Sequence, residues 1–216
     1  MAIENFIQYK NVPLQQNPAF EGIFKKFLEQ QKFTHILEIG TGSGGFTLFL
    51  RDTLPNAKIL TFDIEYRPTY EVLKKNNIDV RLGQIFSEDI KNTDYNICYN
   101  KVDANTVNNS KVPEVIEQEV KDFLALPGKK LILCDGGHKV GEFNCLSRYL
   151  KKGDFIMAHD YADTYDRFMT FLKGKYWDWC EIEEKYIAKA SEENSLVFFN
   201  QIVFETIAWV CKTKLS

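Results

Sequence analysis

The sequence has little positive charge, few cysteines and no long apolar run. Its 27 Lys and Arg residues are outnumbered by 30 Asp and Glu residues, which gives a net charge of −3 at pH 7. A chain without a basic excess lacks the electrostatic footprint of nucleic-acid binding, so we expect no nucleic-acid partner. The five cysteines are odd in number and never spaced C-x-x-C. This argues against a disulfide framework and against a zinc–cysteine site.

Signals for membranes and export are also missing. No uninterrupted apolar run approaches the roughly 18 residues of a spanning helix, and residues 1–10 do not have the pattern of a signal peptide. We therefore expect a cytoplasmic protein without a membrane partner. The 216 residues, 44% of them hydrophobic, suffice for one domain with a sizeable core. We place this single domain at 1–216, with an N-terminal helical extension over 1–32 and an irregular excursion over 92–112.

Short apolar runs alternate with amphipathic helical patterns, which is typical of a parallel sheet covered by helices. The predicted fold is α/β, a Rossmann-like doubly wound, mostly parallel sheet with helices on both faces. At the N-terminal side we expect residues 11–18 to be irregular, with Asn17 and Pro18 beginning a helix. The apolar runs predict strands at Ile36–Ile39, Lys58–Phe62, Ile78–Leu82, Lys130–Asp135, Phe155–Ala158 and Thr206–Lys212.

A glycine-rich loop, Gly40-Thr41-Gly42-Ser43-Gly44-Gly45, follows the first of these strands and opens a helix. Strand, loop and helix N-terminus form a nucleotide cradle whose backbone N–H groups face the crevice. Gly40, Gly42 and Gly45 match the dinucleotide fingerprint G-x-G-x-x-G. Glu38, Gly40, Gly42 and Gly44 match acidic-x-Gly-x-Gly-x-Gly, which resembles the first motif of class I S-adenosylmethionine-dependent methyltransferases. A glycine turn without a ligand is the remaining interpretation.

Further candidate cofactor residues follow the next two predicted strands. Asp63 lies 23 residues after Gly40, where an acid binds ribose hydroxyls in either cofactor class. Gln84 could hydrogen-bond a purine edge, and Ile85 or Phe86 could pack on the ring, although an ordinary loop explains these residues equally well. The cofactor-binding residues predicted from the sequence are Glu38, Gly40, Thr41, Gly42, Ser43, Gly44, Asp63, Gln84, Ile85 and Phe86.

A second chemical cluster follows the fourth and fifth predicted strands. Asp135 and His138 come after one strand, and His159 and Asp160 after the other. The carboxyl ends of parallel strands lie along one edge, so these side chains should converge beside the glycine loop. Two carboxylates at neighbouring strand ends need a cation between them, and Mg²⁺ meets that need, with Mn²⁺ or Zn²⁺ as alternatives. Taken singly, each residue could also be a cap, a turn or a core side chain.

Four separated motifs resemble those of the cephalosporin-hydroxylase-like O-methyltransferase family, which is related to macrocin and rhamnosyl O-methyltransferases. They are Pro13–Pro18, Glu38–Gly45, Asp135–His138 and Gly153–Asp160. The resemblance implies a seven-stranded sheet with an antiparallel C-terminal strand, S-adenosylmethionine as cofactor, Mg²⁺ and a hydroxylated small-molecule acceptor. It also implies Asp135, His159 and Asp160 as metal ligands, with a histidine in place of one acid, and His138 as the base beside Asp135 in the catalytic site.

The sequence therefore predicts a metal-assisted, S-adenosylmethionine-dependent O-methyltransferase. One rival is an NAD(P)-dependent oxidoreductase using the same glycines and Asp63, although no Tyr-x-x-x-Lys arrangement is found. The other rival is a non-catalytic protein that keeps the fold. The identity of the acceptor, the ion, and the choice between a monomer and a homo-oligomer stay open.

Overall fold

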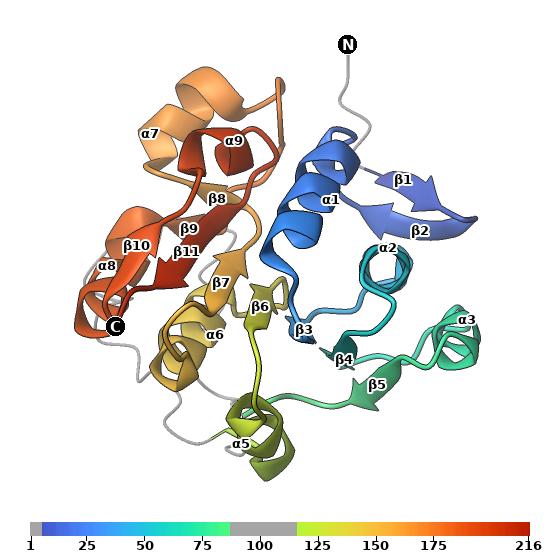
Figure 1. Cartoon of the computed structure of the whole chain (residues 1–216). Coiled ribbons are helices and arrows are strands. Elements are labelled where there is room, and N and C mark those ends of the chain that lie inside the picture. Colours follow the sequence, from blue (N-terminus) through green and yellow to red (C-terminus); the bar gives the residue numbers. More distant parts are fainter. Residues whose placement is uncertain (1–5, 87–115) are drawn as a thin grey trace.

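The computed structural model describes residues 6–86 and 116–216, and its centre is a seven-stranded sheet (Figure 1). The strand order is β10-β11-β7-β6-β3-β4-β5. The five strands β7, β6, β3, β4 and β5 are parallel to one another, and β11 is antiparallel to both β7 and β10. This confirms the predicted fold class. The strands are β3 (His35–Ile39), β4 (Lys58–Asp63), β5 (Asp79–Leu82), β6 (Lys130–Cys134), β7 (Phe155–Ala158), β10 (Leu196–Phe198) and β11 (Val210–Lys214).

Helices cover both faces of the sheet (Figure 1). One face packs against α1 (Phe20–Gln31), α2 (Gly45–Thr53), α3 (Tyr70–Lys75) and α9 (Gln201–Glu205). The other packs against α5 (Gln118–Ala125), α6 (Lys139–Leu146) and α8 (Glu184–Glu193). All five residues of β3 are buried, as expected for a central parallel strand covered on both sides. The sheet edge that follows β3 is thus held by two separate apolar layers.

The apolar layer over α1 consists largely of aromatic rings. Phe20, Phe24 and Phe27 fall at helical spacing and are buried. Phe24 packs edge-on against Phe46 of α2 and against Trp209. Full burial of one such side chain contributes about 1.5–3 kcal/mol, and tilted ring pairs add to it. This packing fixes α2 behind the glycine loop and Trp209 behind the second cluster.

The N-terminal segment departs from the prediction. Residues Phe6–Tyr9 (β1) and Val12–Gln15 (β2) form an antiparallel hairpin, so the irregular segment predicted over 11–18 is wrong. Its two-residue turn places Lys10 and Asn11 at φ of 50° and 65°, a conformation usually signalled by glycine. Helix α1 begins at Phe20, later than predicted, because the Asn17 side chain accepts the N–H of Ala19 in a turn before it.

The chain between β7 and the last strands of the sheet forms a separate two-stranded pairing. In it, β8 (Tyr161–Ala162) pairs in parallel with β9 (Ile182–Glu183). Between them lie α7 (Tyr165–Arg167) and a π-helical turn, η3 (Phe168–Leu172), and a 3-10 turn, η2 (Ser147–Tyr149), follows α6. The strand predicted from Thr206 begins later, at Val210, because Thr206 follows directly on α9 and Ala208 has a φ of 60°.

Two sequence expectations touch residues outside the described ranges. The irregular excursion predicted over 92–112 lies there entirely, as does Cys98. The other four cysteines are free thiols. In the ranges 6–86 and 116–216, no helix is both long and apolar enough to cross a membrane.

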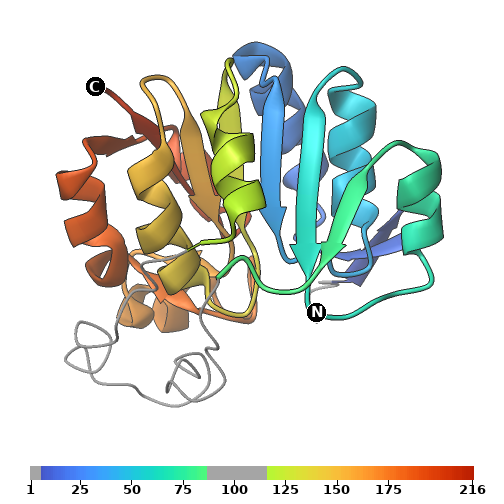
Figure 2. The same ribbon diagram turned by 90° about the horizontal axis from the view of Figure 1, so that it is seen from below.

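The order of the strands creates a switch point between β3 and β6. From β3 the chain winds outward to β4 and β5, then returns to place β6 on the other side of β3. Figure 2 shows the arrowheads of these strands pointing to one edge. In open α/β sheets, ligands bind outside the carboxyl ends of the strands at such a point.

Candidate functional site

A cavity of about 590 Å³ lies at the switch point, within the size range of small-molecule sites. The hairpin, the glycine loop, residues 83–86, the start of α6 and the end of β7 all contribute to its walls. Of the predicted site residues, Glu38 alone does not reach the cavity surface. The predicted residues that line it are Gly40, Thr41, Gly42, Ser43, Gly44, Asp63, Gln84, Ile85, Phe86, Asp135, His138, His159 and Asp160.

Gly40 lies where the glycine loop contacts the residues after β6. It has a φ of +90°, and a Cβ at this position would lie 2.2 Å from the backbone oxygen of Asp135. No other residue type fits such a backbone conformation and such a close approach. The glycine loop and the residues after β6 therefore stand side by side because position 40 has no side chain.

The N–H groups of the glycine loop are largely committed to the protein itself. Gly40 and Thr41 both donate to the carbonyl of Phe62, at 2.8 and 3.1 Å. The N–H of Gly42 donates to Oδ2 of Asp63 at 2.8 Å, which places a carboxylate directly against the loop. The cradle of free N–H groups expected from the sequence is thus partly closed. A pyrophosphate would meet a negative charge here.

Glu38 supports this loop from below. Its Oε2 accepts hydrogen bonds from the hydroxyls of Thr47 at 2.7 Å and Thr61 at 2.6 Å. The Thr61 hydroxyl lies 2.6 Å from that of Thr41 in the loop. Burial raises the pKa of Glu38 to about 7, against the lowering effect of the two threonines. A cofactor role for Glu38 would therefore be indirect, through the position of the loop.

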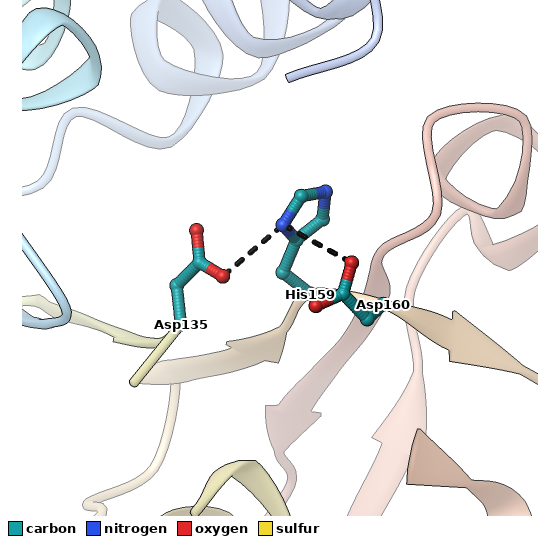
Figure 3. A group of neighbouring side chains, drawn as sticks. All are labelled: Asp135, His159 and Asp160. Carbon is teal, nitrogen blue, oxygen red and sulfur yellow. Dashed lines mark hydrogen bonds and ion pairs between the residues drawn. The ribbon is translucent and has the colours of Figure 1, made fainter. Parts of the chain in front are cut away.

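The second cluster forms as the strand ends predicted (Figure 3). Nδ1 of His159 lies 3.1 Å from Oδ1 of Asp135 and 3.7 Å from Oδ1 of Asp160. One ligand atom from each of these residues lies within 4.8 Å of the other two. Asp160 has a φ of +58°, a left-handed conformation that Asp tolerates better than most residues. Asp135, His159 and Asp160 thus lie together, as their positions at the strand ends predicted.

Lys139 is part of this cluster, although the sequence analysis did not select it. Its buried ammonium lies 2.7 Å from Oε2 of Glu181, 2.9 Å from Oδ2 of Asp160 and 3.1 Å from the carbonyl of Gly136. Burial opposes its charge, but the carboxylates of Asp160, Asp135 and Glu181 raise the pKa of Lys139 well above its ordinary value. A cation therefore already stands between the acids.

Two tryptophans and a glutamine add further hydrogen bonds to the cluster, while Nε2 of His159 is buried without a partner among the described residues. The indole N–H of Trp177 donates to Oδ1 of Asp160. The indole N–H of Trp209 donates to Oε1 of Gln16 at 2.9 Å, which leaves the amide of Gln16 to donate to Oδ2 of Asp135 at 3.3 Å. The sequence resemblance covered Gln16 only as part of a motif, and neither tryptophan has a local pattern that marks it.

His159 is enclosed by aromatic rings. Its imidazole stacks on Trp209 with ring centroids 4.8 Å apart and lies 4.7 Å from Trp177. Burial alone would lower its pKa, but the carboxylates of Asp135 and Asp160 outweigh burial and raise the pKa of His159. Nδ1 of the ring hydrogen-bonds to Oδ1 of Asp135.

His138 lies on the cavity wall, at the start of α6. The loop that carries it is held by Glu142, whose carboxylate accepts the N–H of Gly136 at 3.3 Å and of His138 at 3.2 Å. Burial raises the pKa of Glu142 to about 7, with Lys139 acting in the opposite direction. Glu142 thus plays the same supporting part under this loop that Glu38 plays under the glycine loop. The role of His138 as a base stays a prediction.

The predicted metal ligands fit a divalent ion by distance but not by hydrogen bonding. All four carboxylate oxygens of Asp135 and Asp160 already accept a hydrogen bond or ion pair from the protein. An ion bridging the two carboxylates would have to take the place of the Lys139 ammonium or of the His159 ring, which lie between them. We therefore derive no step through a metal ion. The donors are His159, Gln16, Trp177 and Lys139.

The cavity wall is acidic. Among the described residues it carries six carboxylates against two permanently cationic side chains, Arg67 and Lys139. Since interactions are stronger in a recess than in bulk water, the excess favours a cationic ligand over a pyrophosphate. The six acids are Asp63, Glu65, Asp135, Glu142, Asp160 and Glu181.

Comparison with known proteins finds similar structures but no match by sequence. No protein-family model matches the sequence, and a search of curated proteins finds no match. The structure is similar to the apo-structure of CmcI-N160, with a TM-score of 0.59 and 11% identity over 97% of this chain and 76% of that one. It is also similar to the Mg-SAM structure of cmcI-D160, with a TM-score of 0.54 and 13% identity over 97% of this chain and 77% of that one.

A third similarity, to the precorrin-6y C5,15-methyltransferase from Geobacter metallireducens, has a TM-score of 0.47 and 14% identity over 99% of this chain and 95% of that one. The chain has the Rossmann-like α/β fold of the class I methyltransferases.

Proposed function

We propose that this protein is an S-adenosylmethionine-dependent O-methyltransferase acting on a hydroxyl group of a small molecule. The observation that carries the proposal is the acidic cavity at the switch point of a methyltransferase fold. S-Adenosylmethionine supplies a methyl group on a sulfonium cation and carries an ammonium group as well. Both charges suit a wall with six carboxylates.

Each part of the cofactor has a matching group in the chain. We assign Asp63, at the tip of β4, to the ribose hydroxyls. Ile85 and Phe86, which are buried and line the cavity, offer an apolar wall for adenine, with the exposed Gln84 beside them. The glycine loop then faces the amino-acid end. The similarity to the Mg-SAM structure of cmcI-D160 supports this choice of cofactor.

Methyl transfer needs alignment and a place for one proton. The acceptor oxygen attacks the methyl carbon, an O–CH₃ bond forms as the S–CH₃ bond breaks, and the hydroxyl proton leaves to a base. We assign that proton to His138, which is half-buried on the cavity wall and carries an imidazole that can serve as a general base. The main contribution of the protein is to fix the two reactants in line.

A cofactor titration separates this proposal from its rival. We expect saturable calorimetric binding of S-adenosylhomocysteine and no binding of NADH to the purified protein. Binding of NADH alone would move the protein to the oxidoreductases. If S-adenosylhomocysteine binds, incubation with S-adenosylmethionine and a panel of hydroxylated small molecules should give products heavier by one CH₂. A protein that binds the cofactor but methylates no acceptor fits the non-catalytic alternative.

A further inference from the structure

We propose that Lys139 is the resident cation of the acid cluster and takes the place of a divalent metal ion there. The acid cluster is defined as Asp135, His159, Asp160, Glu181 and Lys139. The inference deepens the proposed function, on which it rests for the assignment of the cluster to the acceptor side of the cavity. It concerns what holds the carboxylates in place.

The ammonium of Lys139 has a complete set of partners. A lysine ammonium has three N–H donors, and three acceptors lie in hydrogen-bond reach, from Glu181, Asp160 and Gly136 at 2.7, 2.9 and 3.1 Å. A fourth oxygen, Oδ1 of Asp135, lies 3.7 Å away. The side chain is 7% exposed, so solvent provides little screening. Lys139 is thus coordinated by oxygens from three separate segments, as a bound metal ion would be.

Every carboxylate oxygen of the two aspartates already has a donor from the chain. In Asp160, Oδ2 faces Lys139 and Oδ1 accepts from Trp177. In Asp135, Oδ1 faces Nδ1 of His159 and Oδ2 accepts from Gln16. The orientation of the Gln16 amide is fixed, because its oxygen accepts from Trp209. The position between the two carboxylates is thus taken by Lys139 and His159, and an ion bridging Asp135 and Asp160 would have to replace one of them.

The charge of the cluster leads to the same conclusion. Three carboxylates face one ammonium and the imidazole of His159, whose Nδ1 donates to Asp135. A divalent ion added to this set would lie close to the ammonium of Lys139, and like charges at that distance repel strongly when buried. With Lys139 removed, the same three acids would form an anionic recess suited to a hard divalent cation.

The consequence is a positioning role for Lys139. A covalently attached cation cannot be removed by a chelator, and its position is set by α6. It keeps Asp135 and Asp160 beside the cavity without taking part in proton transfer, since all its protons are shared with fixed acceptors.

The test is metal binding, with Mn²⁺ as the probe. We would titrate Mn²⁺ into the native protein and into Lys139→Met, following free Mn²⁺ by electron paramagnetic resonance and the melting temperature by calorimetry. We expect no saturable site in the native protein. We expect one Mn²⁺ site in Lys139→Met, with an affinity at least about 10-fold higher than that of any Mn²⁺ binding to the native protein. Saturating Mn²⁺ should raise the melting temperature of this variant by about 5 °C.

Lys212→Met is the matched control. Lys212 is buried like Lys139 but faces one carboxylate, that of Glu184, so its loss should create no Mn²⁺ site. If Lys139→Met does not fold, the Mn²⁺ titration of the native protein tests the proposal by itself. A single Mn²⁺ site in the native protein that disappears in Asp135→Asn would overturn the proposal. So would a folded Lys139→Met that binds no more Mn²⁺ than the native protein.

This experiment involves no methyl transfer, so it is independent of the proposed function. A protein that binds neither S-adenosylhomocysteine nor Mn²⁺ would contradict the function and leave the inference about Lys139 standing. If methylation is found, turnover should be unchanged in EDTA. Loss of turnover in EDTA with recovery on Mg²⁺ addition would count against Lys139 as the resident cation.

Discussion

The cavity has two halves whose carboxylates are held in different ways. The glycine-loop half, formed by residues 39–46, 62–67 and 83–86, presents apolar walls together with Asp63, Glu65 and Arg67, and both oxygens of Asp63 accept backbone N–H groups. In the acid half, formed by residues 135–142, 159–160 and 177–181, every carboxylate oxygen of the two aspartates is bonded to a side-chain donor. The carboxylate of one half is thus held by the local backbone, and the carboxylates of the other are held by side chains from distant segments.

The difference shows what each half contributes to a reaction. A reacting hydroxyl needs neighbours whose positions do not change, and the acid half offers such neighbours. The two halves are alike in their foundations, since each loop rests on one buried carboxyl, Glu38 or Glu142. The two halves differ in the side chains that the supported loop presents to the cavity.

The largest expected effect comes from removing the cation of the acid half. In Lys139→Met, three carboxylates lose their partner, and breaking a buried ion pair from one side costs about 3–5 kcal/mol. We expect the melting temperature to fall by about 10 °C in metal-free buffer, measured by calorimetry. Adding Glu181→Gln should recover part of the loss by removing one unpaired charge. A fall of less than about 2 °C would show that the acid half does not depend on Lys139.

The foundations of the halves can be tested by pH. The folded-state pKa of Glu38 is about 7, above its ordinary value of 4.5, so the folded protein keeps a proton that the unfolded chain releases between these values. The free energy of unfolding therefore falls as the pH rises from about 4.5 to about 7. Glu38→Gln removes this titration. Its stability relative to the native protein should rise across the window by on the order of 3 kcal/mol.

Chemical denaturation at several pH values measures this difference. Glu142→Gln, in the acid half, should give a change of the same sign over the same window, because burial also raises the pKa of Glu142 to about 7. A stability difference that does not vary with pH would contradict the buried-carboxyl account for the variant concerned.

The junction of the halves gives the next effect. Gly40→Ala places a Cβ 2.2 Å from the Asp135 oxygen at a φ of +90°, and we expect a loss of about 3 kcal/mol in unfolding free energy. Gly42→Ala is the matched control, since its φ is +54° and no atom lies within 4 Å of the added Cβ. It should cost about 1 kcal/mol. Equal losses in urea denaturation would mean that the contact with Asp135 is unimportant.

The smallest effect separates binding from chemistry. Asp63→Asn removes the charge expected on the ribose and weakens the hydrogen bond to Gly42, so the Kd for S-adenosylhomocysteine should rise about 10-fold. Asp135→Asn, in the acid half, should leave that Kd within about 2-fold while lowering turnover, because it weakens the hydrogen bonds that hold Gln16 and His159 in place. Isothermal titration measures both. A larger loss of cofactor affinity in Asp135→Asn than in Asp63→Asn would reverse the assignment of the halves.

The sequence predicted the strands and strand ends of both halves, but not the hydrogen bonds that hold the side chains. Apolar runs located the parallel strands, and the strand ends brought Asp135, His159 and Asp160 together as expected. Lys139 was missed although it carried a signal. A lysine in the first turn of a helix opposes the helix dipole, which indicates an acid partner nearby.

Other partners carried no local signal. Trp177 and Glu181 reach the cluster through the pairing of β8 with β9, and Gln16 bonds to Asp135 across 119 positions of the chain. The hairpin was also missed, because its turn uses Lys10 and Asn11 in a conformation that glycine usually marks. Short-range patterns reveal strands and loops, whereas contacts between distant segments appear only once the chain has folded.

The bond between Trp209 and Gln16 joins residues 193 positions apart, and this has a consequence for synthesis of the protein. The strand β11, which follows Trp209, inserts between β7 and β10. During translation the glycine loop and the strands around it can assemble while later residues are still being added. The stacking partner of His159 and the anchor of Gln16 arrive together with the last strand. The nascent chain can thus acquire a cofactor cradle well before it has a site in which that cofactor could be used.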